Sequence, residues 1–272
     1  GHVELSRIAA ALNKGRERLD VAGHYQGGML SYEGEWYWGI DRLVHLEARL
    51  KKEGAEGSLG MVPGDSASLA SQIGRPLNSA VELYLSFRSP YSYVAIPQFI
   101  ELRDRYGVEV DVRPVLPMVM RGLPVPRAKR LYIARDAKRE ADHLGVPLGR
   151  VCDPLGKGIG NAMAVFHHCA APRGIGLEFF HSIAKGAWSE GRDIARLSEL
   201  IELAERGGVG EADVRAAIAQ GGWKEWAQSN RDALTELGLW GVPSFRIGAY
   251  STWGQDRVPL LKAEIARLST RE

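Results

Sequence analysis

The segment Ser89-Pro90-Tyr91-Ser92 places two hydroxyl groups directly after an alternating apolar run, residues 81–87, and directly before an expected helix. Proline is favoured in the first turn of a helix, and a serine in front of it is a common N-cap. The unpaired amides and the dipole at a helix start favour a negative charge. From these residues alone, Ser89 is explained as an ordinary helix cap, at a helix start that would also favour a bound anion.

A second segment, Gly241-Val242-Pro243-Ser244-Phe245, lies far downstream. In isolation a Val-Pro pair is more often a turn with a trans peptide. In thioredoxin-like folds, however, such a pair usually has a cis peptide and lies opposite the strand-to-helix corner, which carries Cys-x-x-Cys in redox members. Ser89 and Ser92 stand at those two thiol positions. The two distant segments therefore predict one site, with hydroxyls in place of thiols.

Composition narrows the class of protein. The 272 residues are 45% hydrophobic and 25% charged, enough for one large domain or one domain plus part of another. A net charge of +2 without a dense Lys/Arg block disfavours nucleic acid. No apolar run is long enough to span a bilayer, and the start has no signal-peptide pattern. We therefore expect a soluble cytoplasmic protein that binds neither membrane nor nucleic acid.

The two cysteines, Cys152 and Cys169, are far apart in the sequence. They form neither a Cys-x-x-Cys pair nor a four-ligand zinc site, which excludes dithiol chemistry within this chain. His167 and His168 precede Cys169, but adjacent residues on a helix point in different directions. The sequence therefore predicts no metal site.

The motif Trp-Gly-x-Asp-Arg occurs twice, at residues 38–42 and 253–257, each time before a helical pattern. The second copy closes a full domain, whereas the first has only a short helix and a hairpin in front of it. We predict a partial repeat in residues 1–50, left from a lost front half or belonging to a longer tandem protein. Residues 51–79, rich in Gly, Ser, Ala and Pro, predict a flexible linker.

From residue 80 to 272 the pattern predicts a thioredoxin-like α/β fold with a helical insertion at about 126–237. Helices in this position usually cover the site as a lid. The elements expected outside the insertion are a strand at 81–87, a helix at 90–106, strands at 108–115, 244–247 and 250–252, and a helix at 256–268. Those expected inside it are helices at 127–143, 178–188, 194–206 and 211–219.

The domain resembles the 2-hydroxychromene-2-carboxylate isomerases and kappa-class glutathione transferases, within the DsbA-like group of thioredoxin folds. The matching segments are residues 87–93, 187–194, 241–245 and 253–257. The resemblance implies that Ser89 is the catalytic serine, which donates a hydrogen bond to the sulfur of bound glutathione. It also implies that glutathione lies along Val242 and Pro243 as an added strand does, with Asp256 on its ammonium and Arg257 near a carboxylate. Asp256 is equally well explained as a helix cap.

For the isomerase, the resemblance implies reversible addition of glutathione to an aromatic unsaturated carboxylic acid. The substrate pocket would include Tyr91, Trp188, Lys129 and Arg121, the last in a loop where the family tends to carry an Asn. Trp188 is also explained as a core anchor, and Lys129 as part of a solvated basic helix face. Dimers are usual among the relatives, so the resemblance makes a homodimer one possible assembly.

Three alternative functions stay open from the sequence. A kappa-like transferase would use the same thiolate but release the adduct as product. A DsbA-like thiol-disulfide oxidoreductase is disfavoured because Ser89 and Ser92 replace both thiols. A non-catalytic binding protein would keep the groove for an extended peptide.

Overall fold

The computed structural model describes residues 4–57 and 79–269. They fall into two compact units, one comprising residues 1–62 and 124–139 and the other residues 63–123 and 140–272. Helix α5 (Arg127–His143) contributes residues to both units. The predicted linker lies mostly outside the described residues, although helix α2 (Leu43–Lys52) includes its first two positions. The predicted division of the chain near residue 80 stays a prediction.

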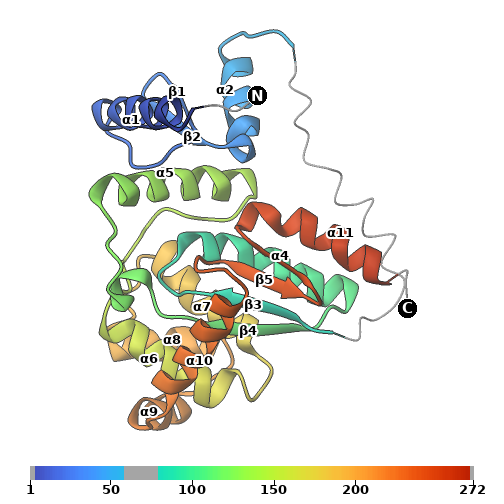
Figure 1. Cartoon of the computed structure of the whole chain (residues 1–272). Helices are drawn as coiled ribbons and strands as arrows, with labels where there is room; N and C mark the ends of the chain where they lie inside the picture. The colour runs from blue at the N-terminus through green and yellow to red at the C-terminus, as the bar shows by residue number, and fades with distance from the viewer. Residues whose placement is uncertain (1–3, 58–78, 270–272) are drawn as a thin grey trace. The chain divides into compact units, whose positions relative to one another are not determined.

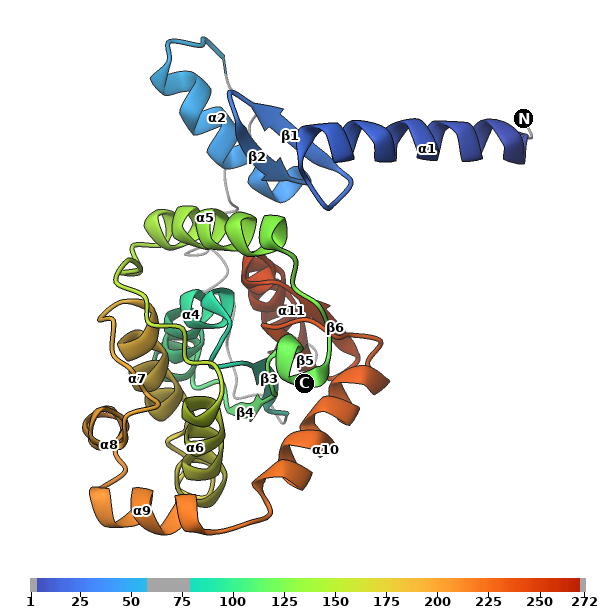
Figure 2. The ribbon, with the colours of Figure 1, turned by 90° about the vertical axis from the view of Figure 1, so that its left-hand side faces the viewer.

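The first unit contains a helix, a hairpin and a second helix, in addition to its part of α5. Helix α1 (Leu5–Ala22) ends at Gly23, whose positive φ of 72° suits a C-cap glycine. Strands β1 (Met29–Tyr32) and β2 (Glu35–Trp38) form an antiparallel hairpin. Its two-residue turn has positive φ at both positions, as a type I′ turn requires. Figures 1 and 2 show this hairpin and α2 on one side of α5.

The hairpin, a 3-10 turn η1 (Ile40–Arg42) and α2 follow one another in the first unit, while their origin as a partial repeat stays a prediction. The second unit ends with the same order: β5 (Ser244–Ile247), β6 (Tyr250–Trp253), η4 (Gln255–Arg257) and α11 (Val258–Ser269). In each copy the motif glycine, Gly39 or Gly254, has a positive φ. The glycine of the motif is therefore explained by backbone geometry at the strand-to-turn junction.

The second unit is built on a four-stranded sheet in the order β4-β3-β5-β6 (Figure 1). Strand β3 (Val81–Leu85) pairs in parallel with β4 (Val110–Pro114), and helix α4 (Pro90–Tyr106) joins them. Strand β5 is antiparallel to both β3 and β6. This arrangement, with helices between β4 and β5, confirms the predicted thioredoxin-like fold with a helical insertion.

The insertion fills the chain between β4 and β5, as predicted, and Figure 2 shows its last helix, α10, leading back to β5. Helix α6 was not predicted as a separate element because it contains two glycines. One of them, Gly158, leaves no room for a Cβ, which would lie 2.8 Å from a carbon of Ile194. The other helical elements between β4 and β5 in the second unit are η2 (Met118–Arg121), α6 (Lys157–Val165), η3 (Phe166–Ala170), α7 (Gly176–Trp188), α8 (Leu197–Arg206), α9 (Glu211–Ala219) and α10 (Trp223–Glu236).

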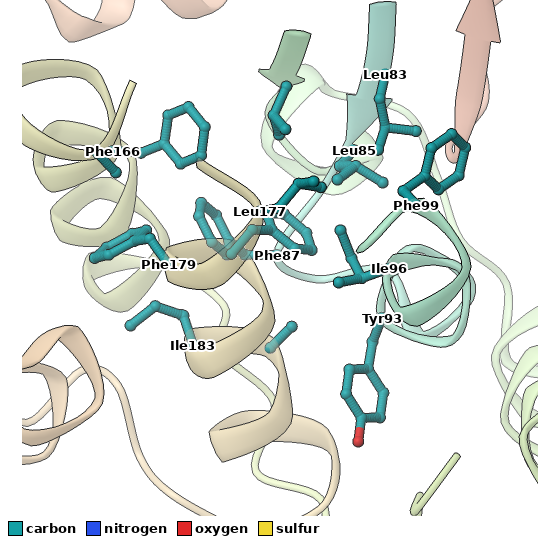
Figure 3. Close-up of a cluster of buried hydrophobic side chains, with 14 of the residues drawn as sticks. Leu83, Leu85, Phe87, Tyr93, Ile96, Phe99, Phe166, Leu177, Phe179 and Ile183 are labelled. Carbon is teal, nitrogen blue, oxygen red and sulfur yellow. The ribbon is translucent and has the colours of Figure 1, made fainter. Parts of the chain in front are cut away.

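An aromatic cluster joins the end of β3 to the insertion (Figure 3). Phe87 stacks on Phe180 with ring centroids 4.5 Å apart, and Phe166 and Phe179 contact Phe87 edge-on. All four rings are fully buried, and each such burial stabilises the fold by roughly 1.5–3 kcal/mol. This packing holds the backbone at Phe87, two residues before Ser89, in a fixed position. Across residues 4–57 and 79–269, no helix is long and apolar enough to cross a membrane.

Candidate functional site

Ser89 caps helix α4, as its position before Pro90 predicts. Its backbone is extended, and its Oγ accepts a hydrogen bond from the backbone N–H of Ser92 at 3.1 Å. Ser92 is fully buried, and its own Oγ accepts from the backbone N–H of Ser86 at 3.2 Å. The two serines at the predicted thiol positions thus differ. Ser92 holds the end of β3 against α4, whereas Ser89 is half-buried and keeps a hydroxyl proton for other partners.

Val242 and Pro243 lie opposite this corner. The peptide between them is cis, as predicted. The Ser89 hydroxyl donates to the Val242 carbonyl, with an oxygen-oxygen distance of 3.5 Å. Hydroxyl hydrogen bonds to oxygen usually measure about 2.7–2.8 Å, so this one is weak. Ser89 and the Val-Pro pair, 153 residues apart, therefore face one another with the hydroxyl proton loosely held.

The predicted cofactor-binding residues Asp256 and Arg257 follow a loop that is tied to the same corner. The backbone N–H of Gly254 donates to the Pro243 carbonyl at 2.9 Å. A Cβ on Gly254 would overlap the Asp256 carboxylate, so this carboxylate folds back over the loop. Asp256 and Arg257 are both half-buried at the start of the last helix. The structure brings them near Pro243, while their roles toward a cofactor stay predictions.

Residues on the insertion flank the other side of the corner. Trp188 donates from its indole Nε1 to the Phe87 carbonyl at 3.0 Å. Arg88, next to Ser89, forms two hydrogen bonds of 2.7 and 2.6 Å with Asp153. Tyr91 lies half-buried in the first turn of α4. Tyr91 is therefore close to Ser89 in the chain and Trp188 is close to it in space, while their role in a substrate pocket stays a prediction.

The other two predicted pocket residues are basic. Arg121 ends η2, and its Nη2 donates to the Trp240 carbonyl at 3.4 Å, two residues before Val242. Lys129 belongs to the first unit, where burial lowers the pKa of its ammonium group. The structure therefore joins Arg121 to the Val-Pro loop, whereas a role for Lys129 at the pocket stays a prediction.

The two thiols of the chain are held in their protonated form. Burial raises the pKa of Cys152, and the carboxylates of Asp193 and Glu199 add to that effect. Burial also raises the pKa of Cys169. Because the thiolate is the reactive form, neither residue is prepared to act as a nucleophile near neutral pH.

His167 and His168 have structural partners. The ring of His167 stacks on Trp226, and His168 donates from Nε2 to the Gly221 carbonyl at 2.9 Å. Within residues 4–57 and 79–269, no three His, Cys, Asp or Glu side chains form a group that could hold a metal ion.

Sequence reasoning did not identify Trp240 as part of this region. Its indole stacks on that of Trp253, with ring centroids 6.2 Å apart. Trp253 lies over the backbone of Gly241, where a Cβ would come within 2.8 Å of the indole Cδ1. The only signal in the sequence was the position of Trp240 immediately before Gly241-Val242-Pro243.

Replacing Gly241 by alanine is expected to displace Trp253 or the Val242-Pro243 loop. Such overpacking typically costs about 1–3 kcal/mol of stability. We expect a lower Tm and a changed tryptophan emission. Gly221→Ala is the matched control, because a Cβ at that position would have no atom of a non-adjacent residue within 4 Å. Equal Tm values for the two variants would contradict the close packing of Trp253 on Gly241.

Comparisons with known proteins agree on the fold. Residues 80–266 match the family model described as a DSBA-like thioredoxin domain. The 2-hydroxychromene-2-carboxylate isomerase of Pseudomonas putida is 24% identical over 198 residues, which cover 69% of this chain and 95% of that protein.

Two solved structures are similar to the same part of the chain. The structure of 2-hydroxychromene-2-carboxylate isomerase has a TM-score of 0.58 and 22% identity, covering 71% of this chain and 97% of that one. The cytosolic disulfide reductase DsbM from Pseudomonas aeruginosa with GSH has a TM-score of 0.54 and 20% identity, covering 71% and 98%. At these identities the structures show a shared fold.

Proposed function

The chain belongs to the DsbA-like thioredoxin family, and from that premise we propose that it is a glutathione-dependent isomerase of aromatic unsaturated carboxylic acids. The observation that carries the proposal is the Ser89 hydroxyl, half-buried at the start of α4, whose hydrogen bond to the Val242 carbonyl is long, at 3.5 Å. Its position is that of a redox thiol, but its chemistry is that of a hydrogen-bond donor.

The residues at the corner fit a thiol cofactor such as glutathione. A sulfur held near Ser89 would receive the loosely bound hydroxyl proton, and the helix start would favour its negative charge. Neither Cys152 nor Cys169 offers a competing thiolate, because the pKa of each is raised. The donor set thus suits a thiolate brought by a cofactor.

The remaining cofactor contacts follow from the placement of the loop residues. Val242 would hold the peptide-like body of glutathione through its backbone, next to the cis peptide. Asp256 would pair with the ammonium group, and Arg257 with a carboxylate. When bound, glutathione would supply the nucleophilic thiolate for reversible addition to the unsaturated acid. The protein's part is to orient this thiolate and to stabilise its charge.

The relatives support this proposal over its alternatives. The curated relative is named as an isomerase, and one structural relative was solved with GSH. That second protein is a disulfide reductase, but in this chain serines occupy both predicted thiol positions. A cytoplasmic location, as the sequence predicts, suits the proposal because glutathione keeps thiols reduced there.

The direct test is interconversion of 2-hydroxychromene-2-carboxylate and its open-chain isomer by the purified chain, followed by absorbance. We expect turnover that requires glutathione and saturates with it, with no conjugate accumulating. S-methylglutathione is the matched control, since it keeps every group except the free thiol and should bind without supporting turnover.

Each alternative function predicts a different result. Release of a stable glutathione conjugate would favour a kappa-like transferase, and insulin reduction would favour an oxidoreductase. Calorimetry that detects no glutathione binding, together with binding of extended peptides, would contradict the isomerase and favour a binding module.

A further inference from the structure

Two partly exposed tryptophans, with their indoles stacked on one another, lie beside the Val242-Pro243 loop. Trp240 and Trp253 are 57% and 38% exposed, and their ring planes differ by 23°. Trp253 is fixed because it packs on the backbone of Gly241. We call Trp240 and Trp253 the indole pair. Large aromatic side chains left this exposed beside a polar site are typical of ligand surfaces, and a planar ring would stack on them.

A guanidinium group with a buried, unsatisfied N–H lies next to the indole pair. Arg121 donates from Nη2 to the Trp240 carbonyl, but its Nε is buried and has no hydrogen-bond partner in the described part of the chain. A buried N–H group that lacks an acceptor costs stability, and such groups are uncommon in folded proteins. The orphaned Nε of Arg121 therefore points to an acceptor that a ligand would bring.

A second arginine, Arg231, adds positive charge near Arg121 and so favours a bound anion there. Burial lowers the pKa of Arg121, and the positive charge of Arg231 on α10 lowers it further. Two guanidinium groups that repel one another are stabilised when a carboxylate lies close to both. Arg231 itself lies 3.8 Å from the neighbouring Asp232, at the long end for an ion pair, and is partly exposed. An incoming carboxylate would thus meet a positive field that is only partly neutralised.

We infer that Arg121, Arg231 and the indole pair form a subsite for an aromatic carboxylate. The ring stacks on the indoles and the carboxylate accepts hydrogen bonds from Arg121. This inference rests on the proposed function and names the groups that select its substrate, because Trp240 is two residues from the carbonyl that faces Ser89. An arginine here takes the place of the loop Asn expected from the family, and it favours acids over neutral aromatics.

The test compares trans-cinnamate with trans-cinnamamide, two probes of nearly equal shape that differ in charge. Calorimetry is done without glutathione. A charge-assisted hydrogen bond predicts that the wild-type protein binds the acid roughly tenfold or more tightly than the amide. Arg121→Gln should abolish this preference, and Arg231→Gln should reduce it severalfold. Trp240→Ala should weaken binding of both probes, because it removes the stacking surface and leaves the charges in place.

Arg105→Gln is the matched control for loss of a positive charge. Arg105 is exposed in the last turn of α4, roughly 20 Å from the start of that helix, and its replacement should leave both affinities unchanged. Equal affinity of the wild type for acid and amide would overturn the inference. The inference is also overturned if Arg231→Gln keeps the full preference for the acid over the amide. This second measurement can be made even if Arg121→Gln fails to fold.

The probes also separate this inference from the proposed function. Acid-selective binding without glutathione-dependent turnover would contradict the isomerase and keep the subsite. Turnover with glutathione, but without any preference for the acid, would contradict the subsite alone.

Discussion

Replacing Ser89 by alanine is expected to lower glutathione-dependent turnover by roughly 100- to 1,000-fold, the usual effect of removing one donor to a developing or stabilised anion. The hydrogen bond from the hydroxyl to the Val242 carbonyl is long, at 3.5 Å, so its proton is available to a thiolate. In the wild type, the hydroxyl and the helix start together lower the pKa of the bound thiol. In the variant that pKa rises, so less thiolate is present at neutral pH and more appears only as pH increases.

The measurement is a pH titration of thiolate absorbance with bound glutathione, alongside kcat/KM. Ser89 also caps α4, and loss of the cap costs about 1 kcal/mol. Ser92→Ala is the matched control: it removes the hydrogen bond to the Ser86 amide and is expected to reduce stability without raising the thiol pKa. If the Ser89→Ala titration coincides with that of the wild type, the proposed role of Ser89 is wrong.

The fold was predictable where local signals and burial agree. Helix α4 begins and ends as predicted, because Ser89 and Pro90 start it and Gly107, with φ of 64°, caps its end. Strand β3 stops at Leu85, two residues short of the prediction. The reason is tertiary: the Ser86 amide bonds to Ser92 and Phe87 turns into the aromatic cluster.

The site was predictable only where residues lie in recognisable segments. Ser89 and the cis Val242-Pro243 pair were predicted because each follows or precedes a strand of the central sheet. The contact of Arg121 with Trp240, across 119 residues, depends on how two loops pack, and no local pattern encodes it. The repeated Asp-Arg motif is a second case in which the sequence identifies a residue but not its distant contact. The sequence marks Arg42 as a repeat residue, but it does not reveal the buried carboxylate that Arg42 contacts.

That carboxylate belongs to Asp136, and the pair is fully buried within the first unit. Arg42 donates from Nε and Nη2 to the two carboxylate oxygens of Asp136, at distances of 2.9 to 3.0 Å. Arg42 is 3% exposed and Asp136 is not exposed at all. Burial and the charge of Asp136 raise the pKa of Tyr25 to about 12, which keeps this nearby phenol neutral. Arg42 thus compensates the negative charge of Asp136 within the first unit.

Arg42→Met is expected to destabilise the first unit by about 3 kcal/mol, the lower end of the cost of breaking a buried ion pair. The lower end applies because Arg139 also donates to Asp136, at 3.2 Å, and would compensate in part. Hydrogen exchange of the hairpin and α2 measures the effect locally, apart from the unfolding of the second unit. We expect faster exchange throughout residues 29–52.

The double variant Arg42→Met with Asp136→Leu distinguishes an unpaired charge from lost packing. Because buried pairs replaced by apolar residues are often neutral in stability, the second substitution should restore much of the protection that the first removes. Lys51→Gln, which breaks the ion pair between the half-exposed Lys51 and the more covered Glu47, is the control and should change stability by less than about 1 kcal/mol. If Arg42→Met has an equally small effect, the pair does not hold the first unit together. A large effect reversed by Asp136→Leu would establish that the repeat arginine serves structure here, in contrast to the role toward a cofactor carboxylate proposed for Arg257.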